Sequence, residues 1–127
     1  MDLHFTSSVA TDTERNALDA LLGTPSEAHG PEARERRHLL LPALHAIQDR
    51  VGWISAGAVN YIGECLTIPP AEIYGVATFY GLFATEPRAP FVAHVCDDIA
   101  CMDAGAQALS DRLKSEGATI VHAPCLG

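Results

Sequence analysis

Three cysteines near the C-terminal end are the residues best able to do chemistry. Cys96 and Cys101 stand five positions apart in CDDIACMDAG, and Cys125 follows in APCLG, where the sequence stops. The sequence shows no signal peptide and no apolar run of membrane-spanning length, so we expect a cytoplasmic chain without membrane insertion, in a compartment that keeps thiols reduced. Four cysteines in such a compartment point to metal or redox chemistry rather than to a disulfide framework.

The elements around these cysteines should bring the three thiols together. FVAHVC predicts a strand, and ATIVHAP predicts a second strand. Between them, DAGAQALSDRLKSEG predicts an amphipathic helix capped by Asp103, with Ala106, Leu109 and Leu113 on its buried face. A crossover of this length makes the strands parallel, so their carboxyl ends meet at one edge of the sheet. Cys96 closes the first strand, Cys101 lies in the loop behind it, and Cys125 follows the second strand. The start of the helix at the same edge would favour thiolates.

The spacing of the cysteines leaves three kinds of centre open. C-x₄-C is wider than the C-x₂-C knuckle of structural zinc sites and resembles the first spacing of some [2Fe–2S] proteins. It is also too wide for the C-x-x-C of a thiol–disulfide catalyst. A [2Fe–2S] cluster needs four ligands, and the sequence offers three cysteines for it. An iron–sulfur cluster, a zinc site and simple buried thiols are therefore all possible interpretations of the spacing. His94 and His122 are ordinary strand histidines or outer partners of the site, and His122 is a further ligand candidate.

The sequence before Pro87–Pro90 reads as helical. TDTERNALDALLG, EARERRHLLLPALHAIQDRVG, the stretch after Ser55 and PAEIYGVATFYGLF all carry apolar residues at helical spacing. Such helices pack as a small bundle. We therefore expect an α+β chain with a helical domain at 1–88 and a β-α-β domain at 89–127. Cys65 falls within a helix and is expected to be a small buried hydrophobic residue.

Charge and motif content exclude several functions. Eight Lys and Arg against sixteen Asp and Glu give a net charge of −8, which argues against a nucleic-acid partner. The sequence has no glycine-rich phosphate loop and no nucleophile motif, so we do not expect it to bind NAD or flavin, or to be an enzyme by itself. Asp97 and Asp98 beside Cys96 are expected to be solvated carboxylates that keep the local potential negative.

Several of these stretches resemble one known family. LLPALHAIQDRVGWIS, IPPAEIYGVATFYGLF, HVCDDIACMDAGA and the final CLG are similar, in this order, to the thioredoxin-like [2Fe–2S] subunits of NAD-linked oxidoreductases. These include the small iron–sulfur subunit of respiratory complex I and the matching subunits of NAD-reducing hydrogenases and NAD-dependent formate dehydrogenases. The resemblance runs from about Leu39 to Gly127 and does not distinguish among these parent complexes.

The resemblance implies a cluster, its ligands and a partner. The family's ligand pattern is C-x₄-C followed by C-L-G-x-C, so Cys96, Cys101 and Cys125 match three ligands of a [2Fe–2S] cluster, and the fourth would fall two residues beyond Gly127. The implied function is electron transfer to or from a flavoprotein subunit that binds FMN and NAD, onto which the helical bundle would dock.

The family's thioredoxin-like domain continues with a β-hairpin and a final helix that this sequence lacks, so the β-α-β domain is expected to be incomplete and the sequence to belong to a longer protein. The alternative is a cluster-free assembly module whose cysteine site is empty or holds zinc.

Overall fold

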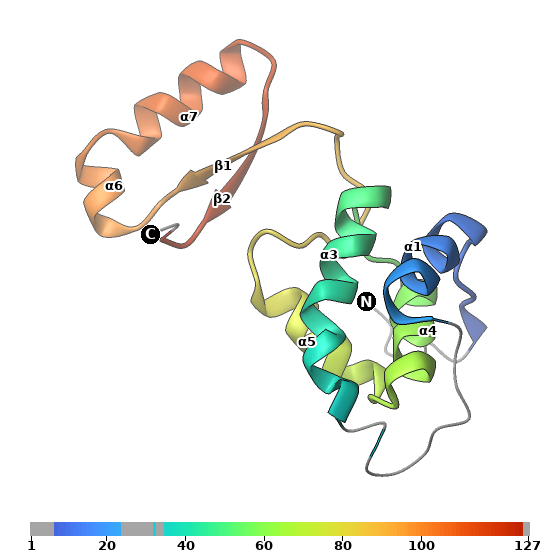
Figure 1. Ribbon diagram of the computed structural model, residues 1–127. Coiled ribbons are helices and arrows are strands. Elements are labelled where there is room, and N and C mark those ends of the chain that lie inside the picture. The colour runs from blue at the N-terminus through green and yellow to red at the C-terminus, as the bar shows by residue number, and fades with distance from the viewer. Residues whose placement is uncertain (1–6, 24–31, 33–34, 126–127) are drawn as a thin grey trace. The chain divides into compact units, whose positions relative to one another are not determined.

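The computed structural model describes residues 7–23, 32 and 35–125 of the chain, which forms two compact units, Met1–Pro87 and Arg88–Gly127. The first unit is helical and the second is a small β-α-β unit with parallel strands (Figure 1). The α+β class expected from the sequence is therefore confirmed.

The helical unit is built from short helices. In its described part they are α1 (Asp12–Leu22), the 3₁₀ helix η2 (Arg36–Leu39), α3 (Leu40–Val51), α4 (Ala56–Leu66) and α5 (Pro70–Phe79). α1 packs on α3 and α4, and α4 packs on α5. Each helix buries one apolar stripe against the others, which stabilises helices too short to persist alone in water.

The ends of these helices follow the sequence signals. Thr11 caps α1 in a reciprocal capping box with Glu14, and Ser55 caps α4 by accepting a hydrogen bond from the Ala58 N–H at 3.0 Å. Gly52 ends α3 with a φ of 90°, a left-handed conformation in which glycine has no steric penalty. Pro70 stands in the first turn of α5, where its missing N–H costs no hydrogen bond.

The core of the helical unit is apolar and is crossed by one buried polar bridge. Glu14 is 2% exposed, and its two carboxylate oxygens accept hydrogen bonds from Thr11 N–H at 2.7 Å and from the Ser55 hydroxyl at 2.6 Å. This carboxylate therefore ties the first turn of α1 to the residue that caps α4. The surrounding buried residues are Leu18, Leu22, Leu40, Ala43, Leu44, Ile47, Ile54, Ala58, Val59, Ile62, Cys65, Leu66, Ile68, Ile73 and Ala77. Cys65 is among them, as predicted.

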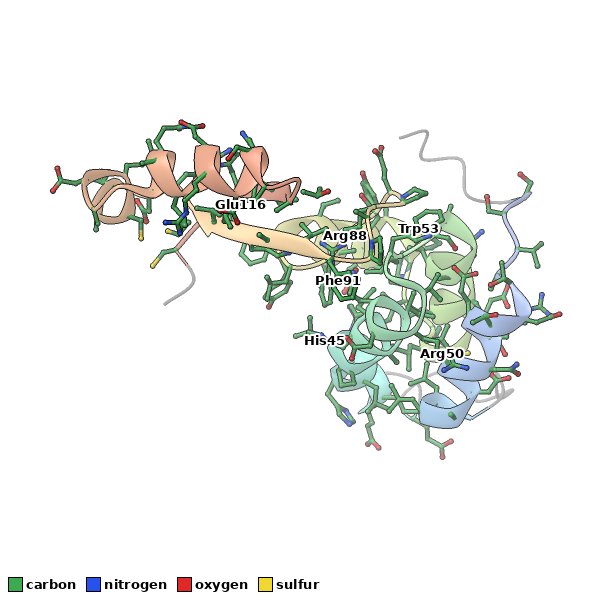
Figure 2. The ribbon with its side chains drawn as sticks, turned by 90° about the horizontal axis from the view of Figure 1, so that it is seen from above. His45, Arg50, Trp53, Arg88, Phe91 and Glu116 are labelled. Carbon is green, nitrogen blue, oxygen red and sulfur yellow. The ribbon has the colours of Figure 1, made fainter. Side chains whose placement is uncertain are left out.

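The segment after α5 is fixed to α3. The Phe83 ring packs edge-on against His45, labelled in Figure 2, with centroids 4.8 Å apart. The Ala84 N–H donates to the Gln48 side-chain oxygen at 2.9 Å, and the Ala84 carbonyl accepts from Ile54 N–H at 2.7 Å. These contacts hold the segment after α5 on the helical unit up to Ala84.

The second unit consists of two strands and two helices. Its elements are β1 (Val92–Cys96), α6 (Ile99–Asp103), α7 (Ala106–Ser115) and β2 (Thr119–Ala123). β1 and β2 are parallel, with Cys96 opposite Ala123, and α7 packs on both strands (Figure 1). The carboxyl ends of the strands therefore lie at one edge of the unit, as the sequence predicts.

Two details of the predicted helix in this unit were wrong. Asp103 does not cap it: Asp103 ends the separate helix α6, and α7 begins after Gly105, whose φ of 101° makes the bend between them. Leu109 is 41% exposed, whereas Ser110 is buried. Leu109 and Ser110 are neighbours on α7, and apolar character alone selects Leu109 for the buried face, whereas the helix turns the small Ser110 inward.

None of the helices within the described residues combines the length and apolar character needed to cross a bilayer.

Candidate metal centre

Cys96 and Cys101 lie together beside a hollow of about 350 Å³ in the second unit. Cys96 is the last residue of β1, and Cys101 is in the middle of α6. Both are half-buried and neither forms a disulfide. The hollow is lined by His94, Val95, Cys96, Cys101, Ala104, Gly105, Ala106 and Leu109. Two thiols from different elements thus face the same partly enclosed space.

The two thiols interact directly. The pKa of the Cys101 thiol is raised, first by its hydrogen bond to Cys96 and the charge of that neighbour, then by burial, and further by the charges of Cys125 and Asp98. A negative charge on one thiol disfavours ionisation of its neighbour, which is why the pKa of Cys101 is raised. A cation between them would reverse that effect, because metal ions displace thiol protons. The pair therefore fits a centre that takes adjacent thiolates.

Cys125 lies close enough to affect the pKa of Cys101 but stands apart from the pair. It is exposed and follows β2 by two residues. Among the described residues, no three His, Cys, Asp or Glu side chains are arranged to hold a metal ion. The described part of the site is therefore a thiol pair with a third thiol in its neighbourhood.

The two strand histidines have different surroundings. His94 lines the same hollow, and its Nε2 lies 3.5 Å from an Arg88 guanidinium nitrogen. His122 lies on the neighbouring strand, where its Nδ1 is 3.9 Å from a carboxylate oxygen of Asp97. Since His122 neighbours Ala123, the partner of Cys96, it points to the opposite face of the sheet from Cys96.

Sequence reasoning missed the helix that carries Cys101. α6 begins after Asp98, whose carboxylate accepts a hydrogen bond from Ile99 N–H at 2.8 Å. An aspartate before a short apolar stretch is an N-cap signal that the sequence does contain. The helix end predicted at Asp103 is displaced to α7, whose N-cap Gly105 has no side-chain hydrogen bond, and Gly105 and Ala106 line the hollow of the two thiols.

The helical unit has a second surface feature, an open groove between α3 and α5 of about 580 Å³. An ion pair between Arg37 and Glu72 crosses one side of it. Phe79 at its edge is 79% exposed and Tyr80 is 44% exposed. The groove is lined by Arg37, His38, Leu40, Leu41, Glu72, Gly75, Val76, Phe79 and Tyr80. An exposed aromatic edge of this kind is typical of a protein-contact surface.

Comparison with known proteins identifies relatives of this chain. Residues 27–123 match the model of a family described as thioredoxin-like [2Fe–2S] ferredoxin. The chain is 31% identical over 108 residues to an NADH-quinone oxidoreductase subunit of Pseudomonas aeruginosa, and 33% identical over 89 residues to the corresponding subunit of Rhizobium meliloti. It is 31% identical over 80 residues to the corresponding subunit of Mycobacterium bovis.

The matches cover more of this chain than of the relatives. They span 85%, 70% and 63% of this chain, in the order given, but 60%, 53% and 32% of the relatives. The chain therefore spans about half the length of the curated relatives it matches.

Proposed function

Because this chain belongs to the thioredoxin-like [2Fe–2S] ferredoxin family, we propose that it is an electron-transfer subunit that holds one [2Fe–2S] cluster. The proposed ligands are Cys96, Cys101 and Cys125, with a fourth ligand that the family resemblance expects beyond Gly127. When bound, the cluster supplies one-electron exchange between ferric and ferrous iron. The observation that carries the proposal is that Cys96 and Cys101, which come from different elements, line one hollow.

The residues around the pair have roles that the cluster would need. The hollow is bordered by Val95, Ala106 and Leu109, which limit water at one side of the thiols. The capped start of α6 fixes the backbone that carries Cys101. Burial and hydrogen bonding near thiolate sulfurs set the reduction potential of such centres, so these residues are proposed to tune it.

The first test removes one thiol at a time. Cys96→Ser and Cys101→Ser should each abolish the spin-½ electron paramagnetic resonance signal that a reduced [2Fe–2S] cluster gives. Cys65→Ala should retain it, because Cys65 belongs to the core of the helical unit and not to the unit of the thiol pair. An undiminished signal in either serine variant would overturn the ligand assignment. A colourless wild-type protein would favour the cluster-free assembly module instead.

The proposed electron partner is the FMN- and NAD-binding flavoprotein subunit of the same complex. The relatives' names make them subunits of NADH-quinone oxidoreductases, which supports a partner that reacts with NADH. We propose that the helical unit docks onto this partner through the groove between α3 and α5. We also propose that the complex is cytoplasmic. Its catalytic activity would require the assembled complex and not this chain alone.

Co-purification tests the groove. Phe79→Ala should reduce recovery of the co-expressed flavoprotein subunit several-fold, since exposed aromatic side chains commonly anchor interfaces. Val9→Ala is the matched control, because Val9 is 70% exposed on the same unit but outside the groove. Equal recovery with both variants would place the docking surface elsewhere.

A further inference from the structure

His94 contributes a buried nitrogen to the surroundings of the two thiols. Resting on the function proposed above, we propose that the Nδ1–H of His94 donates a hydrogen bond to a sulfur of the cluster and thereby raises the reduction potential. His94 would then contact the cofactor without being one of its ligands. Its position on β1, its contact with Arg88 and the surroundings of its Nδ1 atom support this role.

His94 lies on the same side of β1 as Cys96. The two residues are two positions apart on the strand, so their side chains leave the same face of the sheet. His94 also borders the hollow that Cys96 and Cys101 line. The imidazole is therefore next to the space that both thiols share.

The contact with Arg88 fixes which nitrogen of the imidazole carries the proton. The Nε2 of His94 lies 3.5 Å from a guanidinium nitrogen of Arg88, which is labelled in Figure 2. A guanidinium can only donate hydrogen bonds, so Nε2 is the acceptor and the proton of a neutral imidazole is on Nδ1. The positive charge of the guanidinium also polarises the ring, which strengthens the Nδ1–H as a donor.

The Nδ1 atom of His94 is buried and has no hydrogen-bond partner within the described residues. A buried N–H without an acceptor costs free energy, and native proteins leave few of them unsatisfied. The sulfurs of an iron–sulfur cluster accept hydrogen bonds, and such bonds are among the factors that set the reduction potential. A cluster held by Cys96 and Cys101 would therefore supply the acceptor that this nitrogen lacks.

A hydrogen bond from this N–H should favour the reduced cluster. Reduction adds one negative charge, and a hydrogen-bond donor stabilises the more negative form of its acceptor. His94 should therefore raise the reduction potential. His122, on the opposite face of the sheet from Cys96, is not expected to contribute.

The position of the proton on His94 can be tested without a cluster. In protein labelled with ¹⁵N-histidine, a long-range ¹H–¹⁵N spectrum at mildly alkaline pH, where imidazole is neutral, identifies the nitrogen that carries the proton. We expect the proton of His94 on Nδ1, with its signal assigned by loss in His94→Asn. A proton on Nε2 would overturn the proposal, because Nδ1 would then be an acceptor and could not donate to sulfur.

Redox titration of the iron-loaded protein tests the donor itself, with the electron paramagnetic resonance signal of the reduced cluster as the readout. His94→Leu should make reduction about tenfold less favourable, which lowers the potential of a one-electron couple by about 59 mV. His94→Asn should restore most of the potential, because its side-chain amide offers an N–H close to the position of Nδ1. A wild-type potential in His94→Leu, or no restoration in His94→Asn, would contradict the donor role.

Ser110→Ala is the matched control. Ser110 is 1% exposed, and its Oγ is likewise buried without a hydrogen-bond partner in the described part of the chain, but Ser110 does not border the hollow. Removing this hydroxyl should leave the potential unchanged. Equal shifts from Ser110→Ala and His94→Leu would indicate a general effect of polarity and not a hydrogen bond from His94.

Iron content separates this proposal from the proposed function. Normal iron in His94→Leu with an unchanged potential would overturn the role of His94 and leave the cluster proposal standing. Iron near zero in the wild-type protein would overturn both. Loss of iron from His94→Leu and His94→Asn, but not from Ser110→Ala, would show that His94 is needed to hold the cluster and would contradict a donor that only tunes it.

Discussion

At the scale of single residues, the thiols of Cys65 and Cys101 both have raised pKa values, but for different reasons. Burial raises the pKa of the Cys65 thiol to about 11, with a smaller contribution from Asp19, so this core cysteine stays a neutral thiol. Cys101 also has a raised pKa, but mainly because of Cys96, a neighbour that a bound cation would turn into a co-ligand. The buried thiol of Cys65 is therefore expected to be inert, whereas Cys101 together with Cys96 forms a pair suited to a metal.

The buried carboxylate of Glu14 allows a prediction at the same scale. Glu14→Ala should lower the free energy of unfolding by about 2–4 kcal/mol, because it leaves the Thr11 N–H and the Ser55 hydroxyl without their acceptor. Urea denaturation followed by circular dichroism measures this. Glu64→Ala, at an exposed position on α4, should cost less than about 0.5 kcal/mol. Similar losses from the two variants would show that the bridge contributes nothing specific.

At the scale of elements, local signals placed the helix ends of the first unit but misplaced the start of α7. Thr11, Gly52, Ser55 and Pro70 all stand at helix ends where their chemistry predicts, because capping depends only on neighbouring backbone groups. The parallel strands also followed from the length of the crossover. The division into α6 and α7 was missed, because the helix predicted from the sequence runs through Gly105, whose φ of 101° makes the bend between the two helices.

The same limit applies to the candidate site. The topology was enough to place Cys96 and Cys101 together, but the distance to Cys125 depends on backbone beyond the end of β2, which no helical or strand pattern describes. The exposure of Ile99 and Met102 could not be predicted either. A short apolar stretch reads as buried unless the elements that pack against it are known.

A glycine contact between elements provides the next prediction. A Cβ on Gly57 would lie 2.3 Å from the Val9 carbonyl oxygen, so Gly57→Ala should destabilise the helical unit by about 1–3 kcal/mol by forcing α4 away from that segment. On Gly75 of α5 a Cβ would have no heavy atom within 4 Å. Gly75→Ala should therefore stabilise the chain by up to about 1 kcal/mol through helix propensity. Thermal melts of both variants decide this, and a destabilising Gly75→Ala together with a neutral Gly57→Ala would contradict the contact.

At the scale of the whole molecule, the two units would divide the tasks of the proposed electron-transfer subunit. The helical unit contains the large apolar core and an open groove, which suit stability and assembly. The second unit buries few side chains and presents its thiol pair at an acidic end. A two-stranded parallel sheet is small for a separately stable domain, so a bound cluster or partner would add to the stability of the second unit.

The proposed [2Fe–2S] cluster is tested most directly by the number of iron atoms and acid-labile sulfides per chain in protein purified without oxygen. We expect about two of each, as a [2Fe–2S] centre requires. Iron and sulfide near zero, or zinc in their place, would contradict the proposal and would leave the chain as an assembly module with an unused thiol pair.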